Sequence, residues 1–172
     1  MQRGKRTLSA LKKHGRVVVH HAGSTDHNSN HETLAAHLKA TNLGYHYTVD
    51  DDAVFKSKAA GSDGRWTFKQ QAPLTDIVWG ATGCNEHGIH VSIDGNSITT
   101  GVTGDEKTCL VQIIVAIFQQ MGWTKKDLWR IVTHQYVGLH ISYTKYFTEC
   151  PGPPIINWMP ECIRRVGTYL PD

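Results

Sequence analysis

Two short runs of β-branched residues, each followed by a histidine, restrict the fold of this chain more than any other sequence feature. Residues 17–20 read Val-Val-Val-His, and residues 131–134 read Ile-Val-Thr-His. Such runs favour buried β-strands. Each histidine then lies where its strand reaches the edge of a sheet. If the two strands are neighbours, the imidazoles of His20 and His134 converge at that edge.

The rest of the chain alternates between strand and helix patterns. We expect further strands over residues 44–49, 54–56, 76–80 and 89–93. We expect helices over residues 31–41, 105–121 and 154–166, with a short one after Thr124. Alternating apolar residues predict that the strand at 89–93 is half-buried, and apolar residues around most of its circumference make the helix at 105–121 the central buried helix. This mixture predicts an α/β fold with one central mixed β-sheet flanked by helices.

Composition indicates one globular domain. The chain has 172 residues, of which 40% are hydrophobic, and this is enough for a single core. Residues 1–15 are basic and form either a loosely held N-terminal lead-in or a short helix. The domain proper is expected over residues 16–172. We expect a monomer, because no large apolar stripe remains unassigned.

Charge and hydropathy exclude some classes of function. The net charge is +3, and the basic residues are scattered except near the N-terminus, so nucleic acid is not an expected partner. No apolar run approaches the roughly 20 residues that span a bilayer, so membrane insertion is not expected. The basic N-terminus lacks the apolar stretch of a signal peptide. We therefore expect the protein to be made in the cytoplasm without a signal peptide.

The two strand-end histidines are candidate metal ligands. Cys150 follows His134 by sixteen residues and can loop back toward both imidazoles. Three protein ligands with an open fourth position are typical of catalytic zinc. The alternative is that the histidines are hydrogen-bonded core residues and that the cysteine only fills space. The residues alone leave both interpretations open.

Five motifs in order resemble the zinc-dependent N-acetylmuramoyl-L-alanine amidase family, which includes phage lysins and the animal peptidoglycan recognition proteins. They are VVHHAGS at 18–24, LGYHY at 43–47, WGATGCN at 79–85, IVTHQ at 131–135 and TECPG at 148–152. The resemblance runs from about residue 16 to residue 166. It implies a peptidoglycan-recognition or amidase-like fold and a Zn²⁺ ion held by His20, His134 and Cys150.

The resemblance also implies an activity. A zinc-activated water would cleave the amide between N-acetylmuramic acid and L-alanine in bacterial peptidoglycan. Tyr45 would position the water or stabilise the oxyanion, and Thr148 would hydrogen-bond the tetrahedral intermediate. The alternatives are a tyrosine packed at a strand edge and an ordinary loop threonine. As an endolysin, the protein would reach the cell wall through a holin-like route.

Four further residues are expected to contact substrate. His21 lies next to the first ligand, and Trp79 and Asn85 belong to the WGATGCN motif. Lys145 lies in an aromatic loop that could line a glycan groove. Each has a structural alternative, from local hydrogen bonding to covering the core.

The chain departs from the family pattern at three positions. Ser92 stands where some members have a catalytic glutamate, and Gly80 stands where a histidine often follows the tryptophan. His140 lies in the long loop after His134 and is a rival ligand. We prefer His134 because its preceding strand fits the motif.

Two other functions compete with the amidase. A non-catalytic peptidoglycan-binding recognition module would keep the groove, but such modules typically lose the cysteine ligand, and Cys150 is present. A structural domain with incidental histidines would not bind zinc stoichiometrically.

Overall fold

The computed structural model describes residues 4–22, 44–50, 67–93 and 97–172. The helix expected over 31–41 and the strand expected over 54–56 lie outside these residues.

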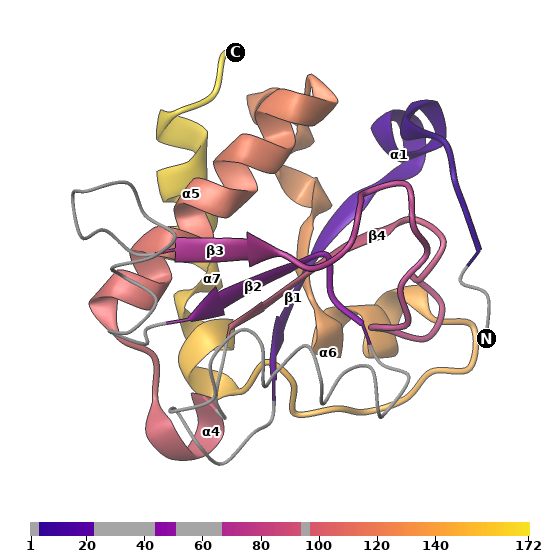
Figure 1. Ribbon diagram of the computed structural model, residues 1–172. Coiled ribbons are helices and arrows are strands. Elements are labelled where there is room, and N and C mark those ends of the chain that lie inside the picture. The colour runs from indigo at the N-terminus through magenta and orange to yellow at the C-terminus, as the bar shows by residue number, and fades with distance from the viewer. Residues whose placement is uncertain (1–3, 23–43, 51–66, 94–96) are drawn as a thin grey trace.

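The described residues form a mixed sheet in the order β3-β2-β4-β1-β5 (Figure 1). The strands are β1 (Arg16–His21), β2 (Tyr47–Asp50), β3 (Thr67–Gln70), β4 (Gly88–Ile93) and β5 (Ile131–Thr133). Four of them run parallel, and β3 pairs antiparallel with β2. The predicted α/β fold with a central mixed sheet is therefore confirmed.

The parallel register brings the two strand-end histidines together. Val17 of β1 pairs with Ile131 of β5, and Val19 pairs with Thr133. His20 and His134 come next on their respective strands, so they emerge side by side at the carboxyl edge of the sheet. This edge is where sites form in open parallel sheets.

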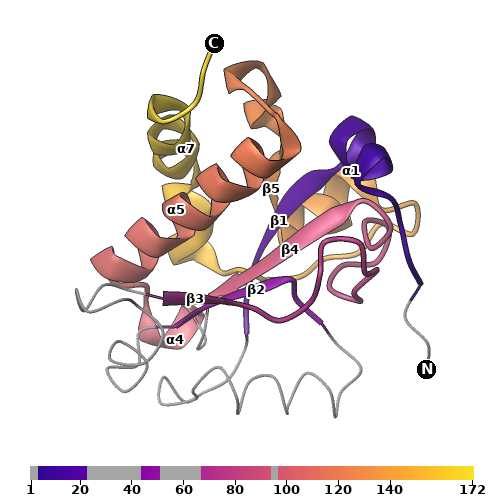
Figure 2. The same ribbon diagram turned by 45° about the horizontal axis from the view of Figure 1, so that its top comes forward.

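Helices cover both faces of the sheet. They are α1 (Leu8–His14), α4 (Ser97–Thr100), α5 (Gly104–Met121), α6 (His134–Tyr136) and α7 (Pro153–Thr168), with a 3₁₀ helix η1 (Lys125–Arg130) and a π-helix η2 (Val137–Ile141). The longest helix, α5, packs against α7 and against β2, β3 and β4 (Figures 1 and 2). On the opposite side, α6 contacts β1. No described helix has the length and apolar character needed to cross a bilayer.

Local signals fix the ends of α5. The side chain of Thr103 accepts from the backbone N–H of Glu106, and the carboxylate of Glu106 accepts from the N–H of Thr103. This capping box satisfies donors that have no partner within the helix. At the other end Gly122 takes the left-handed conformation with φ of 69°. The helix was expected to be the central buried helix, with apolar residues around most of its circumference; it lies on one face of the sheet and keeps an exposed stripe that includes Gln112 and Gln119.

Alternate residues of β1 face two different environments. Val17 and Val19 join the main core beneath α5 and α7. Val18 joins a smaller cluster with Val132 and Val137 on the other face. His20 has the same parity as Val18, so it lies on this second face, away from the main core.

The strand β4 is buried on both faces rather than half-buried. All six of its residues are buried, including His90 and Ser92. The side chains of His90 and Ser92 point to the same face of the sheet as His20, because Val18 pairs with His90 and His20 pairs with Ser92. The polar side chains that alternate with apolar ones along β4 are therefore covered by other parts of the protein and not by solvent.

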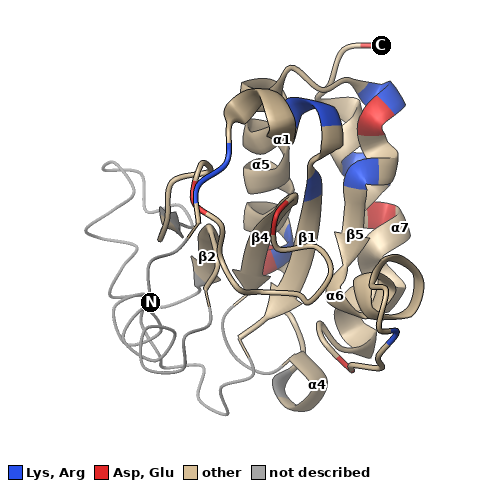
Figure 3. Cartoon of the chain, turned by 90° about the vertical axis from the view of Figure 1, so that its right-hand side faces the viewer, with Lys and Arg blue, Asp and Glu red and all other residues tan. Residues whose placement is uncertain are grey.

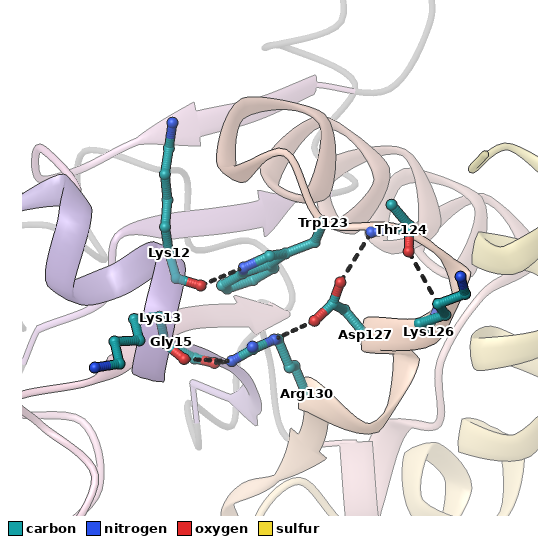
Figure 4. Close-up of polar contacts among 8 residues, drawn as sticks. All are labelled: Lys12, Lys13, Gly15, Trp123, Thr124, Lys126, Asp127 and Arg130. Atoms are coloured by element: carbon teal, nitrogen blue, oxygen red, sulfur yellow. Dashed lines mark hydrogen bonds and ion pairs between the residues drawn. The ribbon is translucent and has the colours of Figure 1, made fainter. Parts of the chain in front are cut away.

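The N-terminal segment forms a helix held to the domain by Arg130 and Trp123 (Figure 4). The Arg130 guanidinium donates to the carbonyl of Gly15 at 2.9 Å and to the carboxylate of Asp127 at 2.9 Å. The Trp123 indole donates to the carbonyl of Lys12 at 2.9 Å. Of the two expectations for this segment, the short helix is the one observed. Figure 3 shows Lys and Arg spread over several elements, including α1 and α7.

Two strand predictions need correction. The segment 76–80 is irregular, with only an isolated bridge between Asp76 and Lys5. Its apolar residues cover the fold instead, since Val78 is fully buried. The strand expected to begin at Gly44 begins at Tyr47.

Candidate metal centre

Three potential metal ligands meet at the carboxyl edge of the sheet. His20 is the last residue but one of β1, His134 begins α6, and Cys150 lies in the loop before α7. One ligand atom from each lies within 4.8 Å of the others. The Sγ atom of Cys150 is 3.7 Å from Nδ1 of His20. Two imidazoles and one thiolate, with a position left open, form a donor set suited to catalytic zinc.

Burial sets the protonation of these groups. Loss of solvation, with smaller contributions from His134, His90 and His21, lowers the pKa of His20 well below its ordinary value. Burial also lowers the pKa of His134 to about 4 and raises the pKa of Cys150 to about 12. At neutral pH both imidazoles are therefore uncharged and ready to coordinate. The thiol is the ligand whose proton a divalent cation must displace.

The imidazole of His134 is hydrogen-bonded to a tyrosine. The Nε2 atom of His134 is 3.1 Å from the hydroxyl of Tyr146, which donates to the carbonyl of Thr82 at 3.3 Å. Because that hydroxyl donates onward, its oxygen accepts from Nε2–H of His134. The proton of the imidazole is then on Nε2, and Nδ1 is left for a metal. No local sequence pattern indicates this contact, and Tyr146 belongs to the aromatic loop that was expected either to line a glycan groove or to cover the core.

A pocket of about 330 Å³ opens beside His134, one of the three potential ligands. Its lining includes Trp79, Asn85, His134, Tyr146 and Thr148. The Trp79 side chain is 55% exposed and forms an apolar wall. The pocket therefore joins one ligand to a surface that a substrate can reach.

Two residues of the pocket brace its walls. The side-chain oxygen of Asn85 accepts from the backbone N–H groups of Gly80 and Ala81, at 3.0 and 2.9 Å. The hydroxyl oxygen of Thr148 accepts from the N–H of Cys150 at 3.2 Å. Asn85 thus fixes the Trp79 loop, and Thr148 fixes the backbone of a ligand.

Other predicted site residues lie outside the pocket lining. Tyr45 is buried beside His20, with ring centroids 5.1 Å apart, and its hydroxyl donates to the carbonyl of His21 at 3.4 Å. The backbone N–H of His21 donates to Sγ of Cys150 at 3.5 Å. Lys145 is exposed, and its amine donates to the carbonyl of His140 at 2.9 Å.

Comparison with known proteins identifies the family. The family model described as N-acetylmuramoyl-L-alanine amidase matches residues 12–153. The chain belongs to this family. Comparison with curated proteins gives no match.

Solved structures of amidases share the fold. An endolysin N-acetylmuramoyl-L-alanine amidase from Clostridium intestinale is 18% identical, with a TM-score of 0.60 and coverage of 88% of this chain and 85% of that one. The hydrolase AmiA from Staphylococcus aureus is 14% identical, with a TM-score of 0.67 and coverage of 96% and 78%. The peptidoglycan recognition protein SD from Drosophila is 11% identical, with a TM-score of 0.61 and coverage of 92% and 85%. The expected peptidoglycan-recognition or amidase-like fold is confirmed.

The three departures from the amidase pattern have definite places. Ser92 is fully buried, and its hydroxyl donates to the carbonyl of Ile93 at 3.2 Å. Gly80 lies against the imidazole of His90, where a Cβ atom would meet Nδ1 at 2.5 Å. His140 is exposed and lies against the ring of Tyr136, with centroids 4.6 Å apart. Within the described ranges, the potential metal group contains His134 and not His140.

Proposed function

We propose that the protein is a zinc-dependent N-acetylmuramoyl-L-alanine amidase that cleaves the amide between N-acetylmuramic acid and L-alanine in bacterial peptidoglycan. One observation carries the proposal. The ligand atoms of His20, His134 and Cys150 lie within 4.8 Å of one another, beside an open pocket, in a member of the amidase family. The protein would act on the cell wall as a monomer of the endolysin type.

The three ligands define what the metal would contribute. A zinc ion held there would lower the pKa of a water molecule and polarise the carbonyl of the substrate amide. His20 and His134 are already neutral at physiological pH, and Cys150 would bind as the thiolate. The backbone N–H of His21 points at that sulfur and stabilises its negative charge.

Hydroxyl groups lie near the three ligands. Thr148 lines the pocket, so its hydroxyl can donate to the amide oxygen of a bound substrate, whereas the hydroxyl of Tyr146 already donates to the carbonyl of Thr82. Tyr45 lies beneath His20 and reaches the same edge of the sheet. We assign to Tyr45 and Thr148 the stabilisation of negative charge on that oxygen. The exposed face of Trp79 would pack against a sugar or the peptide stem.

The test compares the wild type with Cys150→Ser and with His140→Ala, which removes an exposed histidine outside the ligand group. Bound metal is measured by elemental analysis, and new amino termini are measured on purified cell walls. We expect one zinc per chain and release of amino groups by the wild type and His140→Ala, and loss of both in Cys150→Ser. Zinc and wall binding without new amino groups would favour the recognition module. Absence of zinc from the wild type would contradict the proposal.

A further inference from the structure

A third histidine contacts His20, one of the proposed ligands. His90 is on β4, beside Val18 of β1, and is fully buried. Its Nδ1 atom is 2.9 Å from Nε2 of His20, and the two ring centroids are 5.1 Å apart. The other ring nitrogen of His20, Nδ1, is the one that faces Sγ of Cys150. His90 therefore contacts the side of His20 that points away from the potential metal.

The surrounding backbone leaves space for this imidazole and little else. A Cβ atom at Gly80 would come within 2.5 Å of Nδ1 of His90, and one at Gly88 would come within 2.5 Å of Nε2. Both positions must stay glycine for the ring to remain where it is. Among the described residues, Nε2 of His90 has no hydrogen-bond partner. A buried nitrogen without a partner costs stability, so packing alone does not account for a histidine at this position.

Further contacts fix the strand that carries His90. Its backbone N–H donates to Nδ1 of His46 at 3.0 Å, and the two rings stack with centroids 5.9 Å apart. The Nε2 atom of the same His46 ring lies 2.8 Å from a guanidinium nitrogen of Arg6 and 3.1 Å from the carbonyl oxygen of Asp76. The ring of His90 is thus held on a rigid strand by defined hydrogen bonds.

We propose that His90 is a positioning residue that accepts a hydrogen bond from His20 and thereby selects the tautomer of His20 that can bind the metal. This role of His90 depends on which ring nitrogen carries each proton, and it rests on the proposed zinc site. A metal facing Cys150 needs the lone pair on Nδ1 of His20, so the proton of that ring must be on Nε2. His90 Nδ1 is the acceptor within reach of that proton. The proton of His90 is then on its own Nε2.

This arrangement follows a general feature of metal sites. Histidine ligands almost always donate their second ring N–H to a fixed acceptor, commonly a carboxylate or a carbonyl, and loss of that acceptor weakens metal binding by about 10- to 100-fold. Here a neutral imidazole takes that role. Tyr146 does the same for His134, so both histidine ligands are oriented through Nε2.

Two substitutions of His90 separate its role as a hydrogen-bond acceptor from its role in packing. In His90→Asn the side-chain oxygen is two bonds from Cβ, as Nδ1 is in histidine. It can therefore accept the hydrogen bond from His20. In His90→Leu the bulk is similar but there is no acceptor. Zinc affinity is measured by competition with a chelating dye, and the thermal unfolding of each metal-free variant reports whether it folds. We expect about 10- to 100-fold weaker zinc binding for His90→Leu, and an affinity close to that of the wild type for His90→Asn.

Nitrogen-15 NMR of the zinc-loaded wild type gives a second test that needs no variant. We expect both His20 and His90 to carry their proton on Nε2. A proton on Nδ1 of His90 would overturn the proposal, as would zinc affinity that is unchanged in a folded His90→Leu variant or is lost equally in His90→Asn. Failure of the wild type itself to bind zinc would instead overturn the proposed function.

Discussion

The two proposed histidine ligands differ in the group that contacts their Nε2 atoms. His20 is fully enclosed and backed by another imidazole, whereas His134 is partly exposed and backed by the Tyr146 hydroxyl at the pocket. His20 therefore belongs to the rigid sheet. His134 belongs to the side of the centre that a substrate approaches.

The choice between His134 and His140 can be tested by substitution. His134→Ala removes one of three ligands, so we expect zinc binding and amide hydrolysis to fall by at least about 100-fold. His140→Ala removes an exposed ring that contacts Tyr136, so both quantities should stay within about twofold of the wild type. Equilibrium dialysis with zinc and a cell-wall hydrolysis assay measure the two effects. The reverse pattern would assign the ligand to His140.

The role proposed for Tyr45 can be tested by removing its hydroxyl group. Tyr45→Phe keeps the ring beside His20 and removes the group that donates to the carbonyl of His21. If that hydroxyl stabilises charge on the reacting oxygen, kcat should fall by about 100-fold or more while zinc content stays at one per chain. An unchanged kcat would show that Tyr45 only packs against His20.

The three candidate ligands could be singled out from the sequence, but the residues that contact them could not. His20 and His134 follow apolar strands, and Cys150 lies in a distinctive motif, so each carries a local signal. The contact between His20 and His90 joins residues 70 positions apart, and its existence depends on the register of β1 and β4. No local pattern specifies that register for one buried side chain.

At the scale of elements, η1 and α1 depend on one buried cation. Arg130 is 8% exposed, donates to the carbonyl of Gly15 and to Asp127, and lies over the ring of Trp123 at 4.9 Å from its centroid (Figure 4). These contacts tie α1 to the end of α5 and to the start of β5.

Arg130→Leu should therefore destabilise the fold. It removes hydrogen bonds to a charged donor and leaves a carbonyl without its partner, so we expect the free energy of unfolding to fall by about 2–3 kcal/mol. Arg164→Leu provides the matched control, because that guanidinium pairs with Glu161 in an exposed position on α7 and should contribute nothing measurable. Urea denaturation compares the two. Equal effects would show that Arg130 does not anchor α1.

Elements with capping signals could be predicted more closely than those without them. The helix expected over 105–121 differs from α5 by one residue, since the Thr103 capping box and Gly122 mark its ends. The strand predicted over 76–80 was wrong because Ile77, Val78 and Trp79 match a strand pattern, yet Val78 is buried in an irregular segment and Trp79 is 55% exposed at the pocket. Strand propensity reports burial and packing, which irregular segments can also provide.

At the scale of the whole molecule, burial keeps the imidazoles of His20, His90 and His134 uncharged at neutral pH. Burial lowers the pKa of His20, His90 and His134 below their ordinary value of 6.5. Below pH 6.5 the unfolded chain therefore binds more protons than the folded chain. The stability of the metal-free protein is full above about pH 6.5 and is lost as the pH falls.

We expect this loss to begin below about pH 6.5 and to continue toward pH 4, because the pKa of His134 is lowered to about 4. Each fully buried histidine contributes a slope of up to about 1.4 kcal/mol per pH unit below its unfolded pKa. Urea denaturation in the presence of a chelator gives the free energy of unfolding at each pH. His140→Ala, which removes an exposed histidine, should retain the loss. Stability that stays constant or rises toward pH 5.5 would contradict enclosure of neutral imidazoles.

The identity of the cleaved bond tests the central claim most directly. Purified peptidoglycan is digested with the zinc-loaded protein, and the soluble products are identified by mass spectrometry and by labelling of amino termini. We expect stem peptides that begin with a free L-alanine and glycan strands whose N-acetylmuramic acid carries a free carboxyl group, with neither product from Cys150→Ser. Products cut between sugars or within the peptide stem, or no products from a protein that holds one zinc per chain, would contradict the assignment as an N-acetylmuramoyl-L-alanine amidase.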